Sequence, residues 1–229
     1  MLLLFDIDGT LLHGATDAHR DALQDALHEV HRIDARQATV VAPAGRTDGD
    51  IARSILLDAG ISAARIDERA DDVKDECCLR YAQLCPSDLS RTVLPGVREL
   101  LERLSGRDGV ILALLTGNYE PVARLKLERA GIGHYFPSGQ GAFGSDSEDR
   151  AALPAIARRR ATERGRPYPR EETLVIGDTP RDIACARADG VRCVAVATGS
   201  YGVEELEQAD WVVDGALALT ELVARLLSD

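Results

Sequence analysis

Two carboxylates separated by a single residue follow a short apolar run near the beginning of the sequence. They are Asp6 and Asp8, in the segment Asp6-Ile7-Asp8-Gly9-Thr10-Leu11. Gly9 lets the chain turn sharply and pass close to a ligand. Carboxylates this close repel one another unless a cation or a shared proton relieves the repulsion. Mg²⁺ would supply that relief, because it prefers a few carboxylates together with water and phosphate oxygens.

This arrangement suits chemistry at phosphorus. A metal-shielded carboxylate can attack a phosphoryl group and form an aspartyl-phosphate, so Asp6 is the candidate nucleophile. Asp8 is the candidate acid/base, which would give a proton to the leaving alkoxide and later take one from water. Asp178 is the candidate third anchor for the metal ion. The sequence therefore predicts a phosphoryl-transfer site built from carboxylates.

The residues that would do this chemistry stand at the ends of predicted strands. Continuous apolar runs are typical of strands covered on both faces, and hence of a parallel sheet flanked by helices. Ligands bind such sheets beyond the carboxyl ends of the strands. The predicted strands are 2–5, 110–115, 173–176, 191–197 and 211–213. Three of them end in polar clusters, which are Asp6 with Asp8, Thr116 with Asn118, and Asp178 with Asp182.

A long stretch after the first strand has helical periodicity and contains no good strand. The fold class is therefore α/β, a Rossmann-like parallel sheet flanked by helices, with an inserted all-helical cap. The predicted domains are a catalytic core of residues 1–13 and 93–229 and a cap of residues 14–92. The predicted helices are 17–33, Thr47 to Gly60, 64–84, 96–104, 119–130, 150–164 and one beginning at Pro180.

Composition excludes several classes of partner. The net charge of −11 would repel nucleic acid. No stretch approaches the roughly 20 apolar residues that a membrane span needs, and the first residues lack the pattern of a secretory signal. Five cysteines without a CxxC spacing are typical of thiols in a reducing cytosol. We therefore expect a cytoplasmic protein with a small phosphorylated metabolite as its partner, and the sequence predicts no oligomeric state.

Three segments resemble motifs of the haloacid dehalogenase superfamily. They are Asp6-Ile7-Asp8-Gly9-Thr10-Leu11, Thr116-Gly117-Asn118 and Gly177-Asp178-Thr179-Pro180-Arg181-Asp182, which are similar to the first, second and fourth motifs and occur in the same order. The resemblance covers the chain outside the helical insert, and the place of the insert matches the helical cap of the family. It implies a hydrolase that uses Mg²⁺ and an aspartyl-phosphate intermediate.

The resemblance implies a role for each matching aspartate. Asp6 would be the nucleophile and a metal ligand. Asp8 would be the acid/base and would bind Mg²⁺ through its main-chain carbonyl. Asp178 would be a metal ligand, directly or through water, and Asp182 would hold a metal-bound water or orient a neighbour.

The second motif would bind the phosphoryl group. The resemblance implies that the Thr116 hydroxyl contacts phosphoryl oxygens, and that main-chain N–H groups around Gly117 and Asn118 help. An alternative role for Thr116 is the N-cap of the helix 119–130.

The third motif departs from the family pattern, which normally has a lysine there. No lysine follows Lys126 in this chain. Arg150 begins the helix that precedes the strand 173–176, as the lysine of the family does, and we favour it as the replacement that binds phosphate. The alternative is Arg166, which lies in a Gly-Arg-Pro context but leaves too few residues for the intervening helix.

The presence of Asp8 argues against a dehalogenase, because those relatives lack the second aspartate of the first motif. We expect a phosphatase similar to phosphoglycolate phosphatase, because the segment around Arg46 resembles the first helix junction of such caps and Arg46 would contact the substrate. One alternative is a sugar-phosphate mutase similar to β-phosphoglucomutase. The other is a relative that binds phosphate or a partner without turnover, and the complete set of nucleophile, acid/base and metal positions argues against it.

Overall fold

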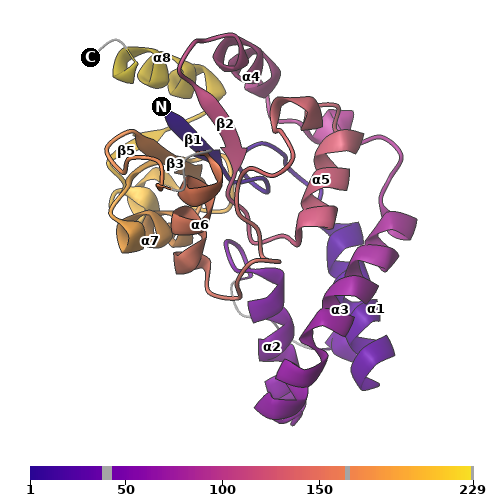
Figure 1. Cartoon of the computed structure of the whole chain (residues 1–229). Helices are drawn as coiled ribbons and strands as arrows, with labels where there is room; N and C mark the ends of the chain where they lie inside the picture. Colours follow the sequence, from indigo (N-terminus) through magenta and orange to yellow (C-terminus); the bar gives the residue numbers. More distant parts are fainter. Residues whose placement is uncertain (38–42, 163–165, 228–229) are drawn as a thin grey trace.

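The computed structural model describes residues 1–37, 43–162 and 166–227, and it is built around one parallel sheet (Figure 1). The strand order is β2-β1-β3-β4-β5, and every neighbouring pair is parallel. The strands are β1 (Leu2–Phe5), β2 (Ile111–Leu114), β3 (Thr173–Gly177), β4 (Arg192–Val196) and β5 (Trp211–Val213). The predicted α/β fold class is confirmed.

Helices cover both faces of the sheet, because successive strand residues point to opposite sides. Leu3 and Phe5 join the core that α4 and α8 close, whereas Leu2 and Leu4 join the core that α6 and α7 close. In Figure 1, α4 and α8 lie above the sheet, and α6 and α7 lie below it. These helices are α4 (Val97–Ser105), α6 (Leu153–Arg160), α7 (Pro180–Asp189) and α8 (Ala216–Leu226).

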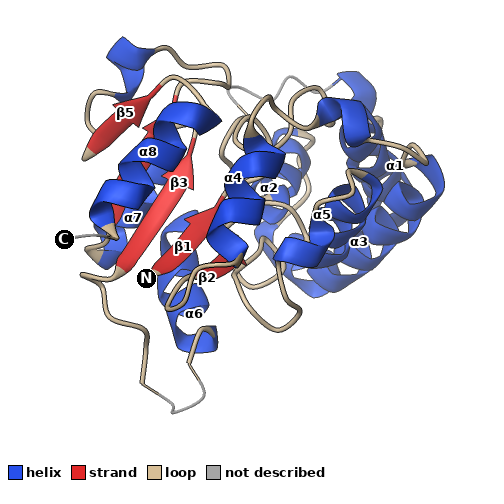
Figure 2. Cartoon of the chain, turned by 90° about the horizontal axis from the view of Figure 1, so that it is seen from above, coloured by secondary structure: helices blue, strands red, loops and turns tan. Residues whose placement is uncertain are grey.

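The helical insert lies beside the carboxyl edge of the sheet and has a core of its own (Figures 1 and 2). Buried Leu27, Val73, Cys77 and Tyr81 belong to this core. It extends into the main domain through Tyr119 and the first turn of α5. The helices of the insert and α5 are α1 (Asp17–His31), α2 (Asp48–Asp58), α3 (Ala63–Leu84) and α5 (Glu120–Arg129). The domain boundaries proposed from the sequence stay a prediction.

The helix predicted over 150–164 is shorter than expected. Residues 150–152 form a 3₁₀ turn, which the Asp149 carboxylate caps by accepting from the N–H of Ala151, and α6 ends at Arg160. Pro154 lies in the first turn of α6, where its missing N–H leaves no hydrogen bond unmade. Residues 163 and 164 lie outside the described residues. The 3₁₀ segments are Ala35–Gln37, Ser90–Thr92, Gly133–Tyr135, Arg150–Ala152 and Val203–Leu206.

All five cysteines carry free thiols, and three of them, Cys77, Cys185 and Cys193, are buried. Among the helices of the described residues, none is both long and apolar enough to cross a membrane.

A buried ion pair joins α6 to α7. Arg158 donates from Nε to Asp189 Oδ2 at 2.6 Å and from Nη2 to Oδ1 at 3.0 Å, and each side chain is 5% exposed. Arg170 also contacts Asp189, at 3.2 Å. Breaking a buried pair leaves the remaining charge uncompensated in the interior.

We expect Arg158→Ala to lower the free energy of unfolding by about 3 kcal/mol, the low end for a broken buried pair because Arg170 still contacts Asp189. Urea unfolding measures the change. The exposed neighbour Arg159 provides the control, since Arg159→Ala should cost less than about 0.5 kcal/mol. Equal losses in the two variants would contradict the prediction.

Candidate active site

Asp6 and Asp178 meet because they follow neighbouring parallel strands. Phe5 of β1 pairs with Ile176 of β3, and the N–H of Asp6 donates to the carbonyl of Ile176 at 2.9 Å. Both carboxylates are almost fully buried at the carboxyl edge of the sheet. One carboxylate oxygen from each of Asp6, Asp178 and Asp182 lies within 4.8 Å of the others. The structure thus gathers the three acidic groups that the sequence placed at two strand ends.

A tight turn leaves room for the carboxylate of Asp178. Gly9 has φ of +90°, and a Cβ there would overlap the Asp178 carboxylate, so a side chain at this position would displace the acid. The hydroxyl of Thr10 donates to Asp178 Oδ1 at 3.2 Å. The glycine and threonine of the first motif therefore shape the site around an aspartate that lies far away in sequence.

The buried carboxylates lack full compensation from the protein. Burial raises the pKa of Asp6 to about 7, although Arg150 works in the opposite direction, and the neighbouring charges of Asp182 and Asp8 add to the rise. Burial, followed by repulsion from Asp6 and Asp182, raises the pKa of Asp178 to about 8. A hard divalent cation would offset both the burial of these negative charges and the repulsion between them. This donor set therefore fits a metal ion such as Mg²⁺.

Arg150 contacts Asp6, whereas Arg166 is exposed. Arg150 Nη2 lies 3.4 Å from Asp6 Oδ1 and also donates to Asp182 Oδ1. The side chain is buried, and its Nε has no hydrogen-bond partner among the described residues. Arg166 is exposed. A buried guanidinium with a free donor beside Asp6 is suited to contact a phosphoryl oxygen.

Asp182 is held by the start of α7. Its Oδ2 accepts from the N–H and the hydroxyl of Thr179, at 3.0 and 2.7 Å, while the Thr179 hydroxyl accepts from the N–H of Asp182. This reciprocal capping box fixes the position of the Asp182 carboxylate, which forms an ion pair with Arg150. Asp182 thus forms an ion pair with Arg150 and lies near Asp6 and Asp178, and its two possible roles stay predictions.

The second motif forms a tight turn against the insert. The Thr116 hydroxyl accepts from the N–H of Asn118 at 3.3 Å. Helix α5 begins at Glu120, with Tyr119 as its N-cap residue, so the alternative of Thr116 as the N-cap is wrong. A Cβ at Gly117 would overlap the carbonyl oxygen of Arg46, which shows how closely the insert approaches this turn.

One charged residue of the site was missed by the sequence patterns. Lys126 of α5 is fully buried, and its Nζ donates to both oxygens of Asp8, at 2.9 and 2.8 Å, and to Asn118 Oδ1 at 2.9 Å. Asn118 Nδ2 also donates to Asp8 Oδ2, at 3.2 Å. The signal was present in the sequence, because Lys126 lies on the buried apolar stripe of α5 with Val122 and Ala123.

The insert is fastened over the second motif by a buried aspartate. The N–H of Asp48 donates to the carbonyl of Gly117 at 2.8 Å, and its Oδ2 accepts from the N–H of Tyr119 at 2.7 Å. The same oxygen lies 3.0 Å from Nε2 of His19 on α1. The hydroxyl of Thr47 donates to the carbonyl of Glu148 at 2.7 Å. These contacts place the loop before α2 directly against the core loops.

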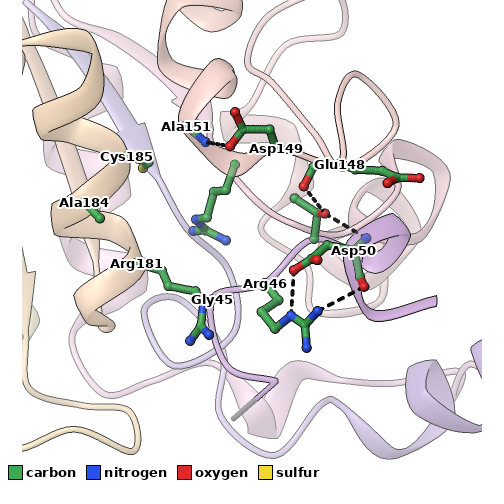
Figure 3. A pocket seen from close by; sticks show the side chains of 11 residues that line it. Gly45, Arg46, Asp50, Glu148, Asp149, Ala151, Arg181, Ala184 and Cys185 are labelled. Atoms are coloured by element: carbon green, nitrogen blue, oxygen red, sulfur yellow. Dashed lines mark hydrogen bonds and ion pairs between the residues drawn. The ribbon is translucent and has the colours of Figure 1, made fainter. Parts of the chain in front are cut away.

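Residues of that loop, residues of α7 and Arg150 line a groove of about 480 Å³ (Figure 3). Figure 3 shows Arg46 and Asp50 on one side and Arg181 and Cys185 on the other. Arg46 Nε pairs with Asp50 Oδ2 at 2.6 Å, so its guanidinium is held against α2. The structure thus places Arg46 on the groove beside Arg150, and its contact with substrate stays a prediction.

Comparisons with known proteins agree with this geometry. A family model for haloacid dehalogenase-like hydrolases matches residues 1–190. A protein named phosphoglycolate phosphatase from Rhodospirillum rubrum is 31% identical over 227 residues, which cover 98% of this chain and 88% of that protein. One of the same name from Pseudomonas fluorescens is 29% identical over 224 residues, covering 95% of this chain and 78% of that protein.

A solved structure shares the fold over nearly the whole length. It is described as a hydrolase from Pseudomonas syringae, and it superposes with a TM-score of 0.67 at 23% identity, covering 97% of each chain. The resemblance in the three motifs is confirmed by the match to the family model and by the relative from Rhodospirillum rubrum. With its motif residues gathered at one edge of a parallel sheet, the chain belongs to the family of haloacid dehalogenase-like hydrolases.

Proposed function

We propose that this protein is a Mg²⁺-dependent phosphatase that hydrolyses small phosphomonoesters through an aspartyl-phosphate on Asp6. The observation that carries the proposal is the buried, incompletely compensated pair of Asp6 and Asp178, with Arg150 in contact with Asp6. The relatives named phosphoglycolate phosphatase support this reaction class.

The metal site would use the carboxylates of Asp6 and Asp178 and the main-chain carbonyl of Asp8. When bound, Mg²⁺ would offset the charge of the nucleophile and of the phosphoryl group. A charge count supports the fit: the carboxylates of Asp6, Asp8, Asp178 and Asp182 outnumber the two cations, Arg150 and Lys126, by two. One divalent ion balances that excess.

The reaction divides between two aspartates. An oxygen of Asp6 attacks phosphorus, and the bond from phosphorus to the ester oxygen breaks while Asp8 gives that oxygen a proton. A water molecule then attacks the aspartyl-phosphate, Asp8 takes its proton, and inorganic phosphate leaves with Asp6 restored.

Phosphate binding falls to the loops that surround Asp6. The Thr116 hydroxyl, the N–H groups around Gly117 and Asn118, and the free Nε of Arg150 are the donors we assign to phosphoryl oxygens. The insert would exclude water from this site. The groove beside Arg150, with Arg46 on its wall, would take the rest of a small phosphorylated metabolite.

The predicted cytoplasmic localisation belongs to this proposal. The free thiols support a protein of the reducing cytosol.

The alternative reaction predicted from the sequence is that of a sugar-phosphate mutase. Such an enzyme uses the same aspartates, but no specific feature of the described residues favours it.

We expect Asp6→Asn to lower kcat for p-nitrophenyl phosphate in the presence of Mg²⁺ by at least about a thousandfold, because an amide cannot act as the nucleophile. Release of p-nitrophenol measures the rate. Asp58→Asn, at an exposed carboxylate at the end of α2, is the matched control and should retain activity. Activity that survives in Asp6→Asn would exclude the aspartyl-phosphate on Asp6 and indicate a different catalytic mechanism.

We expect Mg²⁺ to raise the melting temperature more at pH 8.5 than at pH 6. The raised pKa values of Asp6, about 7, and Asp178, about 8, mean that protonation stabilises the metal-free protein at low pH, and that this stabilisation is lost as the pH rises through 7 to 8. Mg²⁺ must displace the protons at pH 6 but meets ionised ligands at pH 8.5. Thermal unfolding with and without Mg²⁺ measures the difference, and Asp178→Asn should abolish it. An equal effect at the two pH values would contradict the assignment.

We expect Arg150→Ala to lower kcat/KM for p-nitrophenyl phosphate about a hundredfold, because the variant lacks a charged donor at the phosphoryl group. Arg166→Ala is the matched control and should stay within about twofold, since its side chain is exposed. Steady-state kinetics at saturating Mg²⁺ measure kcat/KM for both variants. If Arg166→Ala shows the larger loss, the assignment of the third motif is wrong.

A further inference from the structure

The buried ammonium of Lys126 is fully partnered by active-site residues. Removing a lysine from water is costly unless its charge and its donors find partners. Lys126 has three N–H donors, and its three acceptors are the two oxygens of Asp8 and Oδ1 of Asn118. Every hydrogen bond found for this ammonium among the described residues thus ends on the proposed acid/base or on the second motif.

These contacts determine the direction of the Asp8 carboxylate. Lys126 holds both of its oxygens, and Asn118 Nδ2 holds Oδ2 as well. The carboxylates whose oxygens converge on a possible metal position are those of Asp6, Asp178 and Asp182. Asp8 lies outside that group, turned toward α5. The carboxylate of Asp8 is thus held apart from the possible metal ligands and in one orientation, and an acid/base must be aimed at the oxygen that receives its proton.

The two cations therefore contact different carboxylates. Arg150, at the start of the 3₁₀ turn before α6, contacts Asp6 and Asp182. Lys126, in the last turn of α5, contacts Asp8. The nucleophile and the acid/base are thus held by different elements. A change at Lys126 leaves the contact between Arg150 and Asp6 in place.

We propose that Lys126 is a positioning residue that holds Asp8 in the orientation needed for proton transfer to and from the leaving group. This inference rests on the proposed phosphatase function. It assigns to α5 a second cation of the active site, in addition to the arginine at the third motif. Lys126 acts through Asp8 and Asn118 and makes no contact with the phosphoryl group.

The dependence of the rate on the leaving group tests this role. p-Nitrophenolate is a stable anion that leaves without a proton, whereas benzyl alkoxide needs one, and the two substrates have similar shapes. The measurement is the ratio of kcat/KM for benzyl phosphate to kcat/KM for p-nitrophenyl phosphate. We expect Lys126→Met to lower this ratio by about a hundredfold, the low end for general acid catalysis. A merely structural role would lower both rates together, so an unchanged ratio would overturn the proposal.

A double variant keeps the test decisive if Lys126→Met does not fold. Asp8→Asn with Lys126→Met removes both charges and leaves no unpaired buried ion. If Lys126 acts through Asp8, adding Lys126→Met to Asp8→Asn should change the ratio less than about threefold, because neighbours that share one function are not additive. A further drop of tenfold or more would overturn the proposal.

The Asp6→Asn variant separates the two proposals. If it retains activity, the proposed function fails whatever Lys126 does. If it is inactive while Lys126→Met leaves the ratio unchanged, the phosphatase assignment stands and the role of Lys126 falls. Circular dichroism and the melting temperature of each variant establish that its fold is intact.

Discussion

Burial of the carboxylates of Asp6 and Asp178 at one edge of the sheet is the constraint on which this active site depends. Parallel pairing of β1 with β3 brings the residues after the two strands together, and the surrounding core removes them from water. The cost appears in the pKa of Asp6, raised to about 7, and of Asp178, raised to about 8. Gly9 leaves space for the second carboxylate, and Thr10 donates to it. Two buried carboxylates with raised pKa values form a donor set that fits a divalent cation.

The positive charges that the protein places beside these carboxylates come from two residues, Arg150 and Lys126. Arg150 reaches Asp6 and is braced by Asp182, which the start of α7 fixes through Thr179. Lys126, on α5, donates to the carboxylate of Asp8 and to the side-chain oxygen of Asn118. The carboxylate of Asp6 and the carboxylate of Asp8 are thus held by different cations. Each cation is buried, so each acts where water screens little and its orientation is set by packing.

The helical insert contributes contacts as well as cover. Asp48 joins the N-terminus of α2 to the main chain of Gly117 and Tyr119, and to His19 of α1. The second motif is therefore held between the sheet and the insert. The groove beside Arg150 is lined by residues of the loop before α2 and of the core loops. The turn of the second motif and the wall of this groove thus share the interface between insert and core.

The sequence by itself determined the fold class and the family: the apolar runs predicted the parallel strands, and the residues after them carry the motifs that resemble the family. Arg150 was favoured over Arg166 because Arg166 leaves too few residues for the helix that precedes β3. The contact between Lys126 and Asp8 appears only in the tertiary structure, because the two residues are 118 positions apart in the chain and only the fold brings them together. The short length of α6 and the ion pair between Asp182 and Arg150 likewise depend on local capping and burial. The periodicity of apolar residues in the sequence does not encode either feature.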